Sequence, residues 1–206
     1  PTLTAEERQV SIIISILSNY TPDCLVSVWS ECHIEELYDE KLEMSASEFA
    51  EKLKYAVDIS KVDKYRAVTH NKGIMNGIDA VCLATGNDFR AIEAAAHAFA
   101  AASGSYQGLT QITISHGRFK FSLEIPLSLG TVGGLTSLHP LAKFSLDLLN
   151  RPSAKQLMMI AAAVGLVQNF AALKSLTTSG IQKGHMKMHL LNILNHFAAT
   201  EIEREQ

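Results

Sequence analysis

The spacing of apolar and polar side chains divides the chain into strands and helices. Between Cys24 and Cys32 apolar and polar residues alternate, which predicts a half-buried strand. Ser45 is a typical helix-capping residue and predicts a helix that runs to about residue 60. Four apolar residues share one face of that helix, as the helical period requires: Phe49, Leu53, Ala56 and Val57.

A β-hairpin is predicted further along the chain. Residues 111–114 and 119–125 have the composition of strands, and residues 115–118, Ser-His-Gly-Arg, join them as a turn. Pro126 ends the second strand, because proline cannot donate a hydrogen bond to a strand ladder. A glycine-rich turn follows at residues 129–134.

Three further helices are expected. Residues 89–102 are rich in alanine, which has the highest helix propensity. Residues 140–149 form the second helix, which the segment Asn-Arg-Pro at 150–152 ends. Ser153 caps the third helix, which continues to about Thr178.

The two ends of the chain are less regular. Thr4 is a plausible helix cap, and the apolar residues 12–17 predict either a buried helix end or a short strand. Residues 18–23 form a turn cluster and a candidate crossing between domains. Gly180 breaks the preceding helix, and a last helix carries His185.

The segment 71–90, NKGIMNGIDAVCLATGNDFR, carries the clearest candidate chemistry. Lys72 is expected in a glycine-flanked turn and Asp88 in a second turn, with the apolar run 78–84 between them as a buried strand or a passage from helix to strand. A lysine and an aspartate fixed together in a dry site can stabilise a developing oxyanion. The competing interpretations are a surface lysine and an aspartate that caps the next helix.

Two other patterns are candidate functional sites: the histidines near residue 185 and the glycine-rich turn at 130–134. His185 lies in a glycine-flanked segment where a titratable acid could close over a site, although most histidines are surface or core residues. His189 shares its helix face, but no third ligand is evident, so no metal is expected. The turn Gly-Thr-Val-Gly-Gly at 130–134 is neither a GxGxxG motif nor a P-loop and predicts a close backbone approach.

Composition narrows the class of protein. The 206 residues, 47% hydrophobic with a net charge of −3, suit one or two compact domains and give no reason to expect nucleic acid or an anionic membrane surface. The three cysteines lack metal spacing and predict reduced thiols in a cytoplasmic protein. No signal peptide and no membrane-spanning apolar run is predicted. Because the chain opens at Pro1, we expect it to be a piece of a longer protein.

The motifs taken together resemble a known family over essentially the whole chain. The resemblance is carried by YRAVTHNKGIMNGIDA at 65–80, ATGND at 84–88, GSYQGLT at 104–110, GTVGG at 130–134, VQNFAAL at 167–173 and GIQKGHM at 180–186. In these segments the chain resembles class II 3-hydroxy-3-methylglutaryl-coenzyme A (HMG-CoA) reductase. The resemblance implies reduction of HMG-CoA to mevalonate and coenzyme A with two nicotinamide hydrides, or the reverse oxidation.

The resemblance also implies roles for single residues. Lys72 would stabilise the oxyanion, Asp88 would hold that lysine charged and oriented, and His185 would protonate the departing coenzyme A thiolate. The hydroxymethylglutaryl group would be contacted by three further residues: Arg66, Asn76 and Asn169. NADH or NADPH would be the cofactor, with no metal, and the main dinucleotide motif is absent from these 206 residues. The partners implied are a second copy of the chain, in a homodimer or higher oligomer with a shared site, and no nucleic acid or membrane.

The fold class implied is α+β. It comprises a helix-rich large domain around a central helix with a mixed or antiparallel sheet, the end of a small cofactor-binding domain, and the start of a helical C-terminal flap. The expected boundaries are 1–22 for the end of the NAD(P)-binding domain, 23–178 for the HMG-CoA-binding domain, and 179–206 for the flap. The family's catalytic glutamate falls in an N-terminal segment that this chain lacks.

Two other functions remain open from the sequence. The isolated chain can be an inactive fragment that serves as a dimerisation or HMG-CoA-binding module. Alternatively, the same fold can bind a thioester without reducing it. The choice between NADH and NADPH and the physiological direction are left open as well.

Overall fold

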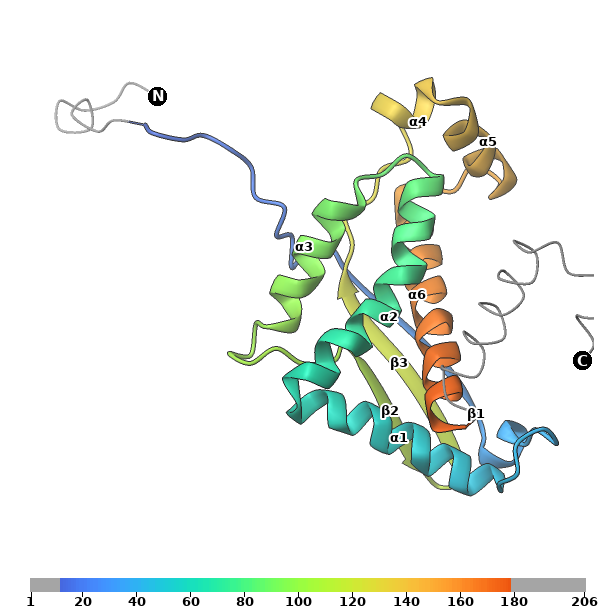
Figure 1. Ribbon diagram of the computed structural model, residues 1–206. Helices are drawn as coiled ribbons and strands as arrows, with labels where there is room; N and C mark the ends of the chain where they lie inside the picture. Colours follow the sequence, from blue (N-terminus) through green and yellow to red (C-terminus); the bar gives the residue numbers. More distant parts are fainter. Residues whose placement is uncertain (1–11, 179–206) are drawn as a thin grey trace, which may run out of the picture.

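The computed structural model describes residues 12–178, which form an α+β fold of helices packed on a small sheet (Figure 1). In chain order the elements are β1 (Leu25–His33), the 3₁₀ helix η2 (Ile34–Leu37), α1 (Ala46–Val62), α2 (Lys64–Ala84), α3 (Phe89–Ala100), β2 (Thr110–Ser115), β3 (Arg118–Pro126), α4 (Gly134–Leu138), α5 (Pro140–Leu148) and α6 (Ala154–Thr177). The α+β class expected from the sequence is therefore confirmed.

The sheet has three strands in the order β1-β3-β2, and both strand pairs are antiparallel. Strands β2 and β3 form the predicted hairpin, whose turn places His116 and Gly117 at positive φ values of 50° and 73°. The register pairs Leu123 of β3 with Val28 of β1 and with Thr110 of β2. Because β3 alternates exposed and buried residues, one face of this strand points into the core and its other face carries polar side chains.

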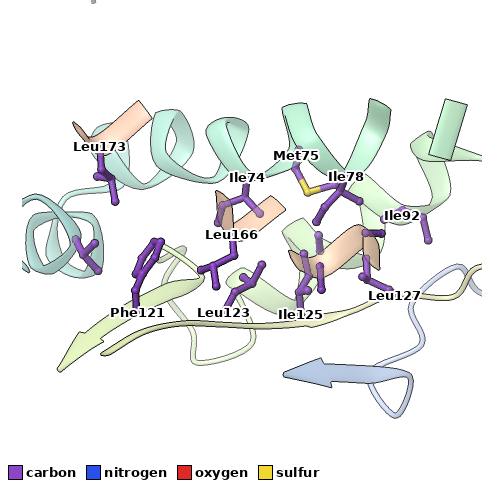
Figure 2. Packing of buried hydrophobic residues seen from close by; sticks show 14 of the residues in the cluster. Ile74, Met75, Ile78, Ile92, Phe121, Leu123, Ile125, Leu127, Leu166 and Leu173 are labelled. Atoms are coloured by element: carbon purple, nitrogen blue, oxygen red, sulfur yellow. The ribbon is translucent and has the colours of Figure 1, made fainter. Parts of the chain in front are cut away.

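The core lies between the buried face of the sheet and the helices α2 and α6 (Figure 2). From the sheet side Phe121, Leu123 and Ile125 of β3 point toward the helices, and Ile74 and Ile78 of α2 face them. Helix α6 lies beside α2 over the same face (Figure 1). The long helices are thereby held in a fixed position against the sheet, and both of them carry predicted site residues.

Side-chain caps begin the helices at the predicted residues. Ser45 Oγ accepts a hydrogen bond from the backbone N–H of Glu48 at 3.2 Å at the start of α1. Ser153 does the same for Gln156 at 3.3 Å and opens α6 with a reciprocal capping box. These bonds satisfy backbone donors that have no partner inside the helix, which explains why the helix starts were predictable.

The segment 71–84 was predicted wrongly. Lys72 does not lie in a turn, and residues 78–84 are neither a strand nor a passage, because all of them belong to the single helix α2. The two glycines that suggested turns lie inside this helix and face α6 instead. A Cβ atom on Gly77 would lie 2.8 Å from the backbone oxygen of Val164 in α6, and one on Gly73 would lie 3.4 Å from Asn169 Nδ2.

Two smaller expectations also need correction. Residues 12–17 are neither a buried helix end nor a strand, since they have no regular structure and Leu17 is 92% exposed. The sequence predicted no apolar run that could span a membrane. Among the described residues, α6 nevertheless has the length and the composition of a helix that could cross one. In the structure α6 packs against α2 and the sheet and buries Leu157, Leu166 and Leu173, as a core helix does.

Candidate active site

Four of the predicted site residues line one cavity. Arg66, Lys72 and Asn76 from α2 and Asn169 from α6 surround a space of about 220 Å³. Lys72 and Asn76 are four residues apart and therefore project from the same face of α2, one helical turn after the other. The structure thus brings two cationic groups and two amide groups to a single cavity beside the crossing of α2 and α6.

The cations of this cavity are available to a ligand. Within residues 12–178 neither Arg66 nor Lys72 forms an ion pair with an acidic side chain. Arg66 is partly buried, and burial lowers the pKa of its guanidinium. An unpaired, partly desolvated guanidinium binds a carboxylate more strongly than an exposed one does.

Asn169 lines the cavity, and hydrogen bonds hold both ends of its side-chain amide. It is 1% exposed, and its Nδ2 donates a hydrogen bond to the backbone oxygen of His70 at 3.1 Å. Its Oδ1 accepts a hydrogen bond from Thr110 Oγ1 at 3.2 Å. The family resemblance named Asn169 but not His70 or Thr110, whose role depends on contacts between distant segments.

Asp88 lies apart from this cavity and caps α3. Its Oδ1 accepts hydrogen bonds from the backbone N–H groups of Arg90 at 3.1 Å and Ala91 at 3.4 Å. Its Oδ2 is 3.0 Å from Arg90 Nη2 in an ion pair. The hydrogen bonds from the Arg90 side chain are the main reason why the pKa of Asp88 is lowered, so this carboxylate stays ionised. The capping role anticipated for Asp88 is confirmed.

Lys72 and Asp88 cannot meet within one chain. Ten residues of α2 separate Lys72 from Cys82, a rise of about 15 Å. The backbone N–H of Asn87 donates to Cys82 O at 2.8 Å, so the turn that carries Asp88 stays at that far end of the helix. Extended lysine and aspartate side chains reach about 10 Å together, and an ion-pair contact adds about 3 Å, which is still less than this rise. The expectation that the two charges lie together is therefore wrong for a single copy of the chain.

The turn with Asp88 is fastened to the glycine-rich segment 130–134. Asn87 Oδ1 accepts from the backbone N–H of Gly130 at 2.8 Å, and Asn87 Nδ2 donates to Gly130 O at 3.1 Å. This pair of bonds joins residues that are 43 positions apart in the chain. Sequence reasoning missed Asn87, because an asparagine in a Gly-Asn-Asp turn gives no signal of a long-range partner.

His185 and the expected flap at 179–206 lie outside the described residues, as does the helix expected at Thr4. The three cysteines that were predicted to be unpaired are free thiols in the structure. Burial raises the pKa of Cys82 to about 12, which makes its thiol unreactive at neutral pH.

Comparison with known proteins decides the family. The model of the hydroxymethylglutaryl-coenzyme A reductase family matches residues 2–190 of the chain. The chain belongs to this family. Two curated relatives are 3-hydroxy-3-methylglutaryl-coenzyme A reductase of Archaeoglobus fulgidus, 47% identical over 164 residues, and a probable reductase of Borreliella burgdorferi, 44% identical over 146 residues. These alignments cover 78% and 71% of the chain but 37% and 34% of the relatives.

Solved reductase structures share the fold. One structure of the Streptococcus pneumoniae enzyme matches with a TM-score of 0.76 and 43% identity, over 93% of this chain and 45% of that one. A class II reductase from the same organism, bound to NADPH in open conformations, matches with a TM-score of 0.74 and 44% identity, over 91% and 45% of the two chains. The chain therefore spans less than half the length of the reductases it matches.

Proposed function

We propose that this chain is the C-terminal portion of a class II HMG-CoA reductase, which converts HMG-CoA to mevalonate and coenzyme A in the cytoplasm or catalyses the reverse oxidation. The observation that carries the proposal is the cavity in which Arg66, Lys72, Asn76 and Asn169 converge within a chain of this family. A carboxylate, a hydroxyl and a thioester carbonyl are the polar groups of the proposed acyl substrate, and cations and amides bind such groups.

Each residue that lines the cavity would bind a different group of the substrate, according to its chemistry. Arg66 would pair with the terminal carboxylate of the hydroxymethylglutaryl group, because a guanidinium forms two parallel hydrogen bonds to a carboxylate. Asn76 and Asn169 would orient the acyl chain through their amides. Lys72 Nζ would lie at the thioester oxygen and stabilise the negative charge that develops there as the carbonyl carbon is reduced.

The departing group needs an acid, and the sequence resemblance assigns this role to His185. When the thiohemiacetal collapses, the C–S bond breaks and the coenzyme A thiolate takes a proton from that acid. The carbonyl of the resulting mevaldehyde is then reduced at the same lysine. His185 lies beyond the described residues, so its part in the reaction remains a prediction.

We place the nicotinamide cofactor outside this cavity. Its volume of about 220 Å³ is below the range of about 300–1,000 Å³ that is typical of ligand pockets. Two molecules of NADH or NADPH, bound one after the other at residues outside this cavity, would supply one hydride each. The family resemblance likewise places the main dinucleotide motif outside these 206 residues.

A shared site between two copies of the chain would reconcile Lys72 with Asp88. The two residues are too far apart to meet within one chain, whereas the far end of α2 in a second copy could bring Asp88 to Lys72. The ionised carboxylate of Asp88 would keep the lysine protonated, because an opposite charge favours the charged form. We therefore propose a homodimer in which each site takes Lys72 from one subunit and Asp88 from its partner.

The test is hydride transfer in the complete reductase that contains this chain. The absorbance of NADH or NADPH is followed after HMG-CoA is added to wild type, to Lys72→Ala and to Lys64→Ala. Lys64 is the matched control because it opens the same helix and lies outside the cavity. We expect Lys72→Ala to lose about 100-fold or more of the turnover number and Lys64→Ala to keep it. Wild-type turnover in Lys72→Ala would overturn the assignment.

A further inference from the structure

In the wall of the cavity, which His70 and Asn169 line, three segments meet in a closed circuit of hydrogen bonds. His70 Nε2 lies 2.6 Å from Thr110 Oγ1, and Thr110 Oγ1 donates to Asn169 Oδ1 at 3.2 Å. Asn169 Nδ2 closes the circuit by donating a hydrogen bond to the backbone oxygen of His70 at 3.1 Å. The three residues come from α2, β2 and α6 and are at most 1% exposed. The circuit is therefore isolated from solvent and joins elements that are far apart in the chain.

The direction of every bond in the circuit follows from the chemistry of its atoms. A backbone carbonyl only accepts, so Asn169 must turn its NH₂ group toward His70 O and its oxygen toward Thr110. An amide oxygen also only accepts, so the single hydroxyl hydrogen of Thr110 points to Asn169. Thr110 Oγ1 can then only accept from His70, which makes Nε2 the protonated nitrogen of the imidazole.

The surroundings of His70 support this neutral Nε2–H form. Its Nδ1 is buried and has no hydrogen-bond partner among residues 12–178, and buried N–H groups without an acceptor are rarer than unsatisfied acceptors. Burial, followed by the positive charges of Arg66 and Lys61, lowers the pKa of His70 to about 3. At neutral pH the ring is thus a fixed donor rather than a titrating group.

The neighbouring residue holds the segment that carries Thr110. Asn71 Nδ2 donates to Gln107 O at 2.8 Å, and the backbone N–H of Leu109 donates to Asn71 Oδ1 at 2.9 Å. This segment also packs tightly at Gly108. A Cβ atom there would lie 2.1 Å from Ser60 Oγ and 3.1 Å from His70 Cδ2. Consecutive residues of α2 therefore fix both the backbone before Thr110 and its hydroxyl group.

We propose that His70 and Thr110 are positioning residues for Asn169, and that the closed circuit fixes which edge of its amide meets the substrate. With one N–H and one lone pair of Asn169 engaged, a bound acyl group meets the second N–H and the second lone pair in a set orientation. This inference rests on the proposed function, in which Asn169 contacts the hydroxymethylglutaryl group. His70 lines the cavity beside Asn169, whereas Thr110 does not, so Thr110 acts on the substrate through Asn169.

Two matched pairs of substitutions separate the hydrogen bond from the shape of the side chain. Thr110→Val keeps the branched shape and removes the hydroxyl, whereas Thr110→Ser keeps the hydroxyl. His70→Leu removes the donor, whereas His70→Gln can place an amide N–H near the position of Nε2. Each variant is made in the complete reductase, its melting temperature is checked, and kcat and KM for HMG-CoA are measured with excess cofactor.

We expect Thr110→Val and His70→Leu each to lose about tenfold or more of kcat/KM, because a buried polar partner is left unpaired. Thr110→Ser and His70→Gln should recover most of this loss. The double variant Thr110→Val/His70→Leu should lose less than the product of the two single effects, since both remove the same circuit. Wild-type activity in Thr110→Val would overturn the proposal. A loss in Thr110→Ser as large as that in Thr110→Val would overturn it as well.

A second readout does not depend on turnover. With nitrogen-15-labelled histidine, the imidazole of His70 should give the signature of a neutral Nε2–H ring, assigned by its loss in His70→Gln. An Nδ1–H ring or a doubly protonated ring at neutral pH would contradict the circuit. If wild type fails to reduce HMG-CoA, the proposed function fails while this measurement still tests the circuit.

Discussion

The crossing of α2 and α6 allows one substitution to be compared at two positions of the same helix. Gly77→Ala would place a Cβ atom 2.8 Å from Val164 O and 3.0 Å from Gln168 Cβ. Gly73→Ala, one turn earlier, would place it 3.4 Å from Asn169 Nδ2 and 3.8 Å from Ala172 Cβ, which is ordinary contact. Backbone atoms cannot rotate away as a side chain can, so only the first substitution forces the helices apart.

The expected difference follows from two opposing effects. Replacing a helical glycine by alanine favours the helix by roughly 0.5–1 kcal/mol at either position. Overpacking a well-packed interface costs about 1–3 kcal/mol and applies only to Gly77→Ala. Because the propensity gain is common to both variants, the difference between them isolates the overpacking cost. Gly77→Ala should therefore be less stable than Gly73→Ala by about 1–3 kcal/mol.

Thermal unfolding of the two variants beside wild type measures this difference. For a protein of this size 1 kcal/mol corresponds to about 2–4 °C in Tm. We expect Gly73→Ala to melt at or slightly above the wild-type temperature and Gly77→Ala to melt several degrees below it. A Gly77→Ala variant as stable as Gly73→Ala would refute the close crossing of α2 and α6.

Two further predictions concern residues near the far end of α2. Burial and the neighbouring Glu93 raise the pKa of Asp79 to about 6, so the folded chain holds this proton more tightly than the unfolded chain, and wild type should lose stability as pH rises from about 4 to 6. Asp79→Asn should remove that loss in urea titrations across this range; an identical pH dependence in both proteins would contradict it. Asn87→Ala should release Gly130, at roughly 1 kcal/mol for each lost hydrogen bond, and speed amide exchange at residues 129–134. Unchanged exchange there would show that Asn87 does not hold the loop.

The elements that were predictable from sequence have local causes. Ser45 and Ser153 mark helix starts because their side chains bind backbone donors only three residues away. The strands around residue 117 were predictable because alternation and a tight turn are also local signals. Each of these features could be inferred without knowing what lies opposite in the fold.

The resemblance implied a central helix, but the residue pattern of segment 71–84 predicted turns and a strand there, because the cause of this helix is not local. Gly73 and Gly77 look like turn residues in the sequence, yet both lie inside α2, and Gly77 is needed where α6 crosses it. This crossing partner is about ninety residues away in the chain, so no window of sequence reveals it. The shared helical face of Lys72 and Asn76 could be recognised only once the helix itself was known.

The site residues show the same contrast between what the sequence reveals and what depends on contacts between distant segments. The resemblance named Asn169, but only the structure places its amide against His70 and Thr110. The sequence suggested that Lys72 and Asp88 act together, and the rise of α2 excludes this within one chain. The separation of Lys72 and Asp88 along α2 is what leads to the proposal of a site shared between two copies.

The most direct test of this account mixes two variants of the complete reductase, Lys72→Ala and Asp88→Asn. Asparagine caps helices as well as aspartate does, so the second variant should keep α3. If each site takes these residues from different subunits, one site of a mixed dimer carries both substitutions and the other carries neither.

Hydride transfer is then measured after the two variants, each inactive alone, are co-expressed with different tags and shown to form mixed dimers. Random pairing puts half of the molecules in mixed dimers with half of their sites intact, so we predict about one quarter of wild-type turnover. No recovery of turnover in verified mixed dimers would contradict a site shared between Lys72 of one subunit and Asp88 of its partner.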